Sequence, residues 1–421
     1  MSRAGLASVG ILAIAGLLCF NILIMPTQAS SQGQVVEGEV IVKLVNGSDL
    51  ASVAQDFSLD PAPIDQFTSQ PIFRLRILDG ASPDTKAAQL LADRKRRVVY
   101  AEPNEIDQSP EGAARVTWSS GGDSGAYVTQ WAPSVIRLYE AQNVTRGAGI
   151  TVAVLDTGVD LTHPTLAGKL VAGYDFIDND NDPSEVGVYG VNRGFGHGTH
   201  VAGLVALTAP EAKIMPVRVL DPEGAGDAWT LAKALAFAMD PDGNPATSDG
   251  ANVINLSISM PDRSKLVRDV LKAVTCVDPL HMSANDLPCF LPDGSGAVVV
   301  SAAGNSGSST PEYPAGDNLA GSVSVGASTQ LDQVASFSNY GSWVMVAAPG
   351  ENILSTVPGG GFGTWSGTSM ATPFVAGEAA LVRAAYPQMS VAKVAQRIIS
   401  KGVYFGSLIK VRIDVAAALG R

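Results

Sequence analysis

Three short segments of the sequence each present one residue suited to acyl transfer. Asp156 ends the apolar stretch Val-Ala-Val-Leu-Asp, His197 lies between glycines in Gly-His-Gly-Thr-His, and Ser369 lies in Gly-Thr-Ser-Met-Ala-Thr-Pro. A serine hydroxyl becomes a nucleophile when an imidazole removes its proton, and a carboxylate holds that imidazole in the required tautomer. Alone, the aspartate and the serine would be ordinary turn or helix-cap residues. Together, the three segments indicate nucleophilic catalysis by a triad.

The elements that position these residues follow an alternating pattern. Strands are expected at residues 150–155, 214–219, 253–257, 297–301, 323–326 and 344–347, and helices at 198–207, 228–239, 264–275, 368–385 and 390–400. Continuous apolar strands separated by helices predict an α/β fold, with a mostly parallel sheet and helices on both faces. Functional groups of such folds gather at the carboxyl ends of the strands. We expect one domain of this kind over residues 127–421.

The chain begins with a long apolar segment that follows Arg3. Small residues at Thr27 and Ala29 fit a signal peptidase site, so residues 1–29 are predicted to be a signal peptide and the protein to be secreted, either extracellular or periplasmic. The alternative is an uncleaved segment that anchors the protein in a membrane. Contact with a membrane is expected only in that case.

Two further regions precede the main domain. Residues 38–104 show strand and helix patterns in the order βαββαβ, which predicts a small α+β ferredoxin-like domain. Residues 105–126 are rich in Gly, Ser and acidic residues and are predicted to be an accessible linker.

Charge and cysteine content narrow the classes of partner and compartment. The formal net charge of −12 disfavours nucleic acid as a partner. Of the three cysteines, Cys19 lies in the apolar segment, and Cys276 and Cys289 are expected to pair in an exported chain. Two reduced, buried thiols are the alternative.

The three motifs, in the order Asp156, His197, Ser369, resemble those of the subtilisin-like serine peptidases, the subtilases. The resemblance covers residues 127–421 and implies the subtilisin-like fold and hydrolysis of peptide bonds through an acyl-enzyme. It implies that Asp156 orients His197, that His197 is the general base and that Ser369 attacks the scissile carbonyl. Asn305, in Ala-Ala-Gly-Asn, resembles the family's oxyanion-hole donor. His200 matches a structural position.

The resemblance also implies where polypeptide substrates bind. The two edges that pair with an extended peptide, and the pocket for the side chain before the cut, correspond to Gly224, Ala225 and Gly226, to Ser257, Ile258 and Ser259, and to Ala302, Ala303 and Gly304. Main-chain pairing gives affinity with little sequence preference. The small residues of the third segment imply an open apolar pocket and a broad preference for apolar side chains. Ser259-Met260 departs from the two glycines that many relatives carry there, which leaves the width of the pocket open.

An acidic loop resembles a calcium site of thermitase-like subtilases. Clustered carboxylates suit a hard cation such as structural calcium, and the expected ligands are Asp175, Asp178, Asp180 and Asp182. The alternative is a solvated acidic loop. No cofactor is expected for catalysis.

The region 38–104 resembles the family's inhibitory propeptide, including its closing Tyr-Ala-Glu-Pro-Asn. This implies a zymogen that processes itself, in which the propeptide aids folding and its tail lies in the cleft like a bound product. The maturation bond is expected within residues 105–126. Two alternatives remain: a catalytically silent peptide-binding member of the fold, and a selective processing protease tethered to a membrane.

Overall fold

A computed structural model describes residues 1, 34–111, 118–244, 247, 249–277 and 285–421. Residues 33–421 form one compact unit. The predicted signal peptide, residues 1–29, lies outside the described part apart from Met1. Among the described residues, no helix has the length and apolar character needed to cross a membrane.

A nine-stranded sheet forms the centre of the larger region, as the alternating pattern predicted. Its order is β17-β18-β14-β13-β12-β11-β7-β9-β8, and neighbouring strands are parallel except for the β17–β18 pair. The strands are β7 (Thr151–Asp156), β8 (Tyr174–Asp175), β9 (Lys213–Arg218), β11 (Val253–Leu256), β12 (Val298–Ala302), β13 (Ser322–Ser328), β14 (Val346–Pro349), β17 (Val403–Tyr404) and β18 (Val411–Arg412).

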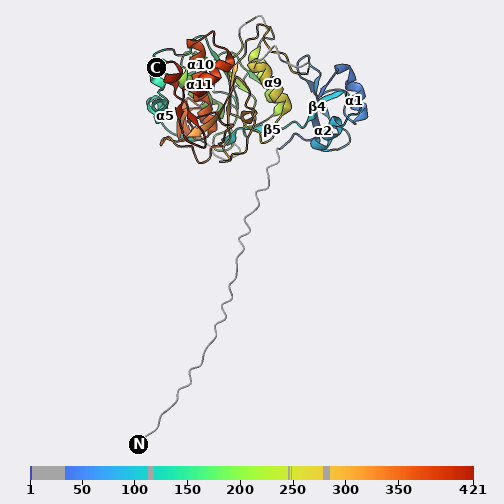
Figure 1. Ribbon diagram of the computed structural model, residues 1–421, viewed down its shortest axis with the longest axis horizontal. Coiled ribbons are helices and arrows are strands. Elements are labelled where there is room, and N and C mark those ends of the chain that lie inside the picture. The colour runs from blue at the N-terminus through green and yellow to red at the C-terminus, as the bar shows by residue number, and fades with distance from the viewer. Residues whose placement is uncertain (2–33, 112–117, 245–246, 248, 278–284) are drawn as a thin grey trace. The chain divides into compact units, whose positions relative to one another are not determined.

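Helices cover both faces of this sheet because successive strand residues point to opposite sides. Val152 and Val154 of β7 pack in one cluster with residues of α7 (His197–Thr208) and α10 (Thr368–Ala385). Ala153 and Leu155 pack in another with residues of α8 (Ala228–Met239) and α9 (Lys265–Thr275). Helix α11 (Val391–Lys401) lies beside α10 (Figure 1). The predicted fold class is therefore confirmed.

Smaller elements complete this region. A three-stranded antiparallel sheet has the order β15-β16-β6, and short helices lie between the N-terminal segment and β7 and at the C-terminus. These elements are β6 (Ser119–Ser120), β15 (Ile353–Val357), β16 (Gly361–Trp365), α4 (Ser124–Thr129), α5 (Trp131–Val135), α6 (Leu138–Gln142) and α12 (Val415–Ala418), together with the 3-10 helices η2 (Pro164–Leu166) and η3 (Ala315–Asp317).

The N-terminal α+β region is a four-stranded antiparallel sheet of order β2-β3-β1-β4 with helices packed on it. Its elements are β1 (Glu39–Leu44), η1 (Gly47–Asp49), α1 (Leu50–Asp56), β2 (Asp65–Gln66), β3 (Ile72–Arg76), α2 (Pro83–Leu91) and β4 (Val98–Glu102). The small antiparallel domain expected from the sequence is thus present.

The stretch predicted to be a linker contains ordered elements. Strand β5 (Ile106–Gln108) pairs antiparallel with β10 (Ala225–Asp227), and β6 pairs with β16. Composition did not reveal these strands because their pairing partners lie far away in the sequence.

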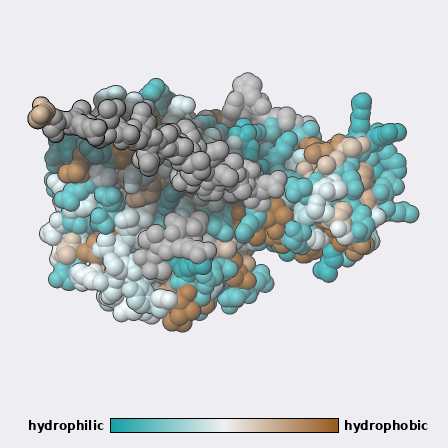
Figure 2. Space-filling view, turned by 90° about the horizontal axis from the view of Figure 1, so that it is seen from below, coloured by the Kyte–Doolittle hydropathy of each residue, from teal (hydrophilic) through white to brown (hydrophobic). Residues whose placement is uncertain are grey.

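Two further features are a disulfide and the character of the surface. Cys276 and Cys289 form a disulfide. On the face in Figure 2, hydrophilic residues are interspersed with small hydrophobic groups, and the described atoms do not gather in one broad apolar surface.

Candidate active site

The predicted acid and base meet at the carboxyl end of β7. Asp156 is the last residue of β7, and His197 is the first residue of α7. His197 Nδ1 lies 2.6 Å from Asp156 Oδ1, and both residues are fully buried. Asp156 Oδ1 also accepts a hydrogen bond of 2.8 Å from Thr157 N, which fixes the carboxylate. This contact is suited to holding the imidazole with Nε2 directed away from the sheet.

Ser369 lies in the first turn of α10, where unpaired backbone N–H groups favour negative charge. The preceding Gly367 has no side chain, and a Cβ there would collide with the carboxylate of Glu111. The Ser369 hydroxyl also lies 3.4 Å from the carbonyl oxygen of Ser257. The backbone around Ser369 therefore leaves room for a carboxylate next to the hydroxyl.

The Glu111 carboxylate occupies the space between the predicted base and nucleophile. Its Oε2 accepts a 2.5 Å hydrogen bond from Ser369 Oγ and lies 2.9 Å from His197 Nε2. Its Oε1 accepts from Asn305 Nδ2 at 2.8 Å and from Ser369 N at 3.4 Å. Base and nucleophile are therefore joined through Glu111.

Asn305 is oriented as a donor by its own neighbours. Its Oδ1 accepts hydrogen bonds of 2.9 Å from Thr368 N and from Thr368 Oγ1, which directs Nδ2 toward Glu111. The amide of Asn305 and the backbone N–H of Ser369 converge on one oxygen. This is the geometry that stabilises a developing oxyanion.

Electrostatic coupling keeps the buried groups charged. Burial alone would lower the pKa of His197, but contacts with the carboxylates of Asp156 and Glu111 raise it to about 10. Burial would likewise raise the pKa of Glu111, but His197, Ser369 and Asn305 together lower it. The site therefore holds an imidazolium between two carboxylates.

The second histidine of the motif has a structural environment. His200 Nε2 lies 3.1 Å from the carbonyl oxygens of Ile353 and Gly363, and burial lowers the pKa of His200 to about 3. Its ring packs edge-on against Trp365, which contacts the His197 ring in the same manner. A neutral His200 therefore supports the position of Trp365 beside the base.

The segment before Glu111 pairs with both predicted substrate edges. Gly226 pairs with Asp107, and Ala225 pairs with Gln108, in the β5–β10 ladder. Ser109 N donates to Gly224 O at 2.8 Å. On the other side, Gln108 and Ser259 exchange two backbone hydrogen bonds of 3.0 and 2.8 Å. The chain therefore lies between two edges as an extended peptide would.

The remaining predicted binding residues form walls next to the oxyanion donors. Ser257, Ile258, Ala302 and Ala303 are buried, and Gly304 directly precedes Asn305. The carboxylate of Glu312 lies against Gly304, at a wall expected from the sequence to be apolar.

Comparison with known proteins follows this geometry. Residues 147–407 match the Subtilase family. The chain is 34% identical over 394 residues to the thermophilic serine proteinase of Bacillus sp. (strain AK1), covering 89% of this chain and 86% of that protein. It is 38% identical over 263 residues to thermitase of Thermoactinomyces vulgaris, covering 60% of this chain and 81% of thermitase.

The chain belongs to the subtilase family. By this homology it is a serine endopeptidase that acts on polypeptides. Its fold also resembles fervidolysin of Fervidobacterium pennivorans, described as a keratinolytic enzyme related to subtilisin, with a TM-score of 0.69 and 22% identity. That similarity covers 92% of this chain and 62% of fervidolysin.

The loop predicted to bind calcium in this subtilase is a poor fit to a cation. Arg218 Nη1 lies 2.6 Å from Asp175 Oδ2 and 2.5 Å from Asp178 Oδ2, so a guanidinium already neutralises both carboxylates. Asp180 and Asp182 accept backbone hydrogen bonds from the loop itself. Among the described residues, one cluster of three carboxylates could hold an ion, because its ligand atoms lie within 4.8 Å of one another. Its members are Asp240, Asp242 and Asp249.

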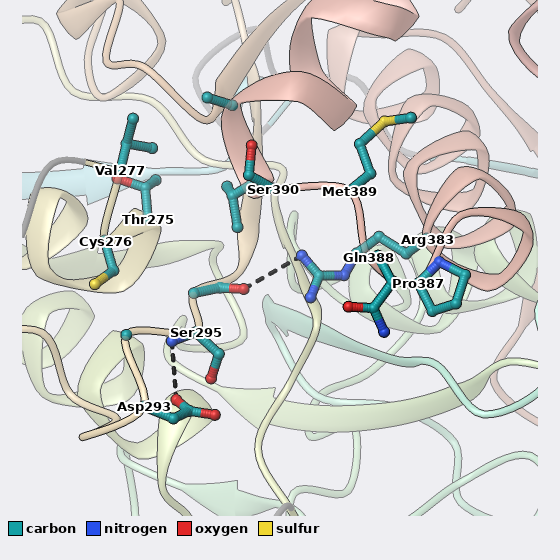
Figure 3. Close-up of a pocket in the computed structure, with 14 residues that line it drawn as sticks. Thr275, Cys276, Val277, Asp293, Ser295, Arg383, Pro387, Gln388, Met389 and Ser390 are labelled. Atoms are coloured by element: carbon teal, nitrogen blue, oxygen red, sulfur yellow. Dashed lines mark hydrogen bonds between the residues drawn. The ribbon is translucent and has the colours of Figure 1, made fainter.

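A separate cavity of about 440 Å³ contains none of the triad residues (Figure 3). Arg383 reaches across it to the carbonyl oxygen of Gly296 at 3.3 Å, and Asp293 accepts from Ser295 N at 2.8 Å. Its polar groups serve local chain contacts.

Several site residues escaped the sequence analysis. Glu111 lies in Ser-Pro-Glu-Gly, which is indistinguishable from other turn-rich acidic sequence. Glu185 accepts from Thr157 Oγ1 at 2.6 Å and Thr199 Oγ1 at 2.8 Å, beside the motifs of Asp156 and His197. Burial raises the pKa of Glu185 to about 7, although those hydroxyls oppose the shift. Only the folded path of the chain brings these carboxylates to the site.

Proposed function

We propose that this subtilase is made as an exported zymogen, and that the segment ending at Glu111 holds its active site in an inhibited state until it is removed. The observation that carries the proposal is the carboxylate of Glu111, which is bound at once by the base, the nucleophile and the oxyanion donor. A peptide carbonyl cannot reach Ser369 while this carboxylate lies there.

The roles of the three catalytic groups follow from their contacts. In the mature enzyme, His197 Nε2 takes the proton of Ser369 Oγ as the oxygen attacks the scissile carbonyl. Asp156 stabilises the resulting imidazolium through its 2.6 Å contact with Nδ1. The carbonyl oxygen becomes an oxyanion and receives hydrogen bonds from Asn305 Nδ2 and Ser369 N. His197 then protonates the leaving amine, and water hydrolyses the acyl-enzyme.

The proposed propeptide, residues 38–104, contacts the peptidase domain through helix termini. Glu102 accepts hydrogen bonds of 2.6 and 2.9 Å from the N–H groups of Lys265 and Leu266 at the start of α9. Asn104 Oδ1 accepts from Trp229 N at 3.0 Å at the start of α8. These contacts align the segment that follows, so that β5 enters the groove between the two substrate edges. They support a role for the propeptide as inhibitor and folding aid.

Recognition along the edges supports broad specificity at those positions. The contacts of Gln108 and Ser109 with the edges are made by backbone groups, which every peptide offers. The pocket for the side chain immediately before the cut differs from these edges, because its walls include the carboxylate of Glu312.

We also propose that structural calcium binds at Asp240, Asp242 and Asp249 rather than in the loop at residues 175–182. The support is the convergence of three carboxylates, of which Asp240 has a buried oxygen without a partner. A chelator should lower the melting temperature of the wild type, and the double variant D242N/D249N should lack that response. Loss of the chelator response in D178N/D182N, with the wild-type response kept in D242N/D249N, would identify the other loop as the site.

The decisive experiment compares wild type with Ser369→Ala, both purified as precursors. The wild type should shed its N-terminal region, whereas the variant should remain an intact precursor. The alternative is a catalytically silent protein that only binds peptides. To test it, the wild type is also treated with a fluorophosphonate, which labels an activated serine. Shedding by the purified Ser369→Ala variant at the wild-type rate would remove self-processing from the proposal.

The N-terminus of the protein recovered from the expressing cells separates secretion from tethering. A chain that begins near residue 30 supports signal cleavage and export. A chain that retains residues 1–29 and partitions with membranes supports the tethered alternative.

A further inference from the structure

Glu312 lies where two walls of the proposed substrate site meet. The next residue, Tyr313, exchanges backbone hydrogen bonds of 2.7 and 2.8 Å with Met260, which follows the substrate edge at residues 257–259. On the other side, Gly304 has a φ of +98°, and a Cβ built there would collide with the carboxylate of Glu312 and the amide of Asn339. The carboxylate therefore lies between the edge that pairs with peptide and the strand end that presents Asn305.

The carboxylate is held by neutral donors. Glu312 Oε1 accepts hydrogen bonds of 2.8 Å from both Asn339 Nδ2 and Ser306 Oγ. Asn339 is itself fixed, because its Nδ2 also donates to Ala303 O at 2.9 Å. These contacts set the direction of the carboxylate and leave its negative charge without a counter-ion.

Nearby cations are already paired elsewhere. The guanidinium of Arg263 stacks on the Tyr313 ring at 4.8 Å and lies 3.0 Å from Asp317 Oδ1, which also binds Arg268 at 3.2 Å. Within the described parts of the chain, no Lys, Arg or His forms an ion pair with Glu312. The charge of Glu312 is therefore available to a cation supplied by a substrate.

The position of the bound segment shows which substrate residue lies next to this charge. Gln108 pairs with Ser259, and Ser109 pairs with Gly224. The side-chain oxygen Oε1 of Glu111, which accepts from Asn305, marks the place of the scissile carbonyl oxygen. In an extended peptide, the residue after the Ser109 position carries that carbonyl. Its side chain enters between the walls at 257–260 and 302–304, where Glu312 lies.

We propose that Glu312 is a specificity-determining residue that selects Lys or Arg immediately before the scissile bond. This inference rests on the proposed function and assigns its substrate class. The long alkyl stems of Lys and Arg suit the apolar wall of Ala302 and Ala303, and their charged ends reach the carboxylate. The sequence predicted an apolar preference from Ala302, Ala303 and Gly304, and that prediction did not take the charge of Glu312 into account.

The test uses the mature wild type and Glu312→Gln, with four chromogenic peptides that differ only in the residue before the cut: Arg, Lys, Phe and Glu. A charge-assisted hydrogen bond contributes enough that kcat/KM for Arg and Lys should exceed that for Phe by about tenfold or more. Glu312→Gln should lose about tenfold on Arg and Lys and stay within about twofold on Phe. Glutamine can still accept from Asn339 and Ser306, so the wall should stay intact.

Two controls isolate the local charge. Glu211→Gln removes the same charge at an exposed residue paired with Arg146 and should leave all four rates unchanged. Glu312→Lys should reverse the preference toward the peptide with Glu. Equal losses on all four peptides in Glu312→Gln, or a wild type that prefers Phe to Arg, would overturn the inference. A wild type that cleaves no peptide and resists fluorophosphonate would instead refute the proposed function.

Discussion

At the scale of single residues, the proposed inhibition depends on the kind of group that Glu111 provides. Its carboxylate offers two oxygens to the donors that would bind a peptide carbonyl and an oxyanion. Attack by Ser369 on a side-chain carboxylate releases no amine, so the group is not a substrate. A charged side chain paired with the His197 imidazolium can therefore inhibit the site without being consumed.

Glu111→Gln should shorten the lag before activity appears in the freshly folded precursor. The amide keeps the shape of the side chain but loses the ion pair with His197, which should weaken inhibition by about tenfold. The measurement is the time course of peptide hydrolysis after folding. Glu37→Gln, at an exposed residue of the same region, is the matched control and should keep the wild-type lag. An unchanged lag in Glu111→Gln would show that its carboxylate does not limit activation.

The sequence predicted some residues of the site and not others for a physical reason. Asp156 ends β7 and His197 begins α7, while Ser369 lies in the first turn of α10 and Asn305 shortly follows β12, so a local pattern marks each of them. Glu111 acts on partners 86 and 258 positions away, and nothing in its neighbours indicates that distance.

At the scale of elements, the proposed propeptide uses the ends of two helices as its attachment points. Asn104 joins the N-terminal region to the start of α8, since its side chain accepts from Trp229 N and donates to Glu39 Oε1 at 2.8 Å and to Asp227 Oδ1 at 3.1 Å. A capped helix start satisfies N–H groups that would otherwise need water. The position of β5, and with it Glu111, follows from this attachment.

Asn104→Ala should speed release of the N-terminal region. Loss of a helix cap costs about 1 kcal/mol, which corresponds to about fivefold weaker docking. The rate at which activity appears in purified precursor measures the effect. Asp123→Ala removes the cap of α4, where Asp123 Oδ1 accepts from Ala126 N at 2.8 Å, and should not change that rate. An equal effect of both variants would point to a general loss of stability.

The regular elements were predicted well and the connections were not. The helix expected at residues 368–385 is α10 with the same ends, because its small apolar residues are periodic and flanked by glycine and a polar turn. The hairpin β15–β16 was missed because its second strand is glycine-rich, and the strand β5 was missed because its partner β10 lies far away in the sequence.

At the scale of the whole molecule, docking of the proposed propeptide and of the segment that follows it buries acidic groups of an already acidic chain. Burial, together with the charges of Asp262, Asp84 and Glu102, raises the pKa of Glu105 to about 7. Burial also raises the pKa of Asp107 well above its usual value, with a further contribution from Asp227. The docked state therefore retains protons on these groups at pH values where the released segment would ionise.

The sign of the resulting pH dependence is fixed by these shifts. The contribution of Glu105 to the free energy of docking is fully present below pH 4.5. It is lost as pH rises through about 7, at up to about 1.4 kcal/mol per pH unit. The raised pKa of Asp107 acts in the same direction. Glu111 acts in the opposite direction. Because its pKa is lowered in the docked state, its contribution to docking is lost only when pH falls through that pKa. Between mild acid and alkali, the net effect is weaker inhibition as pH rises.

We therefore expect Ser369 of the precursor to become accessible as pH is raised from 5 to 9. The measurement is the rate of fluorophosphonate labelling of precursor divided by that of mature enzyme, which divides out the intrinsic reactivity of the exposed Ser369. This ratio should rise by about tenfold or more, because more than one buried carboxyl contributes. Glu105→Gln cannot ionise and should flatten the part of the rise near pH 7. A ratio that stays level or falls with pH would mean that the buried carboxyls do not control docking, since their ionisation can act only in the direction of release.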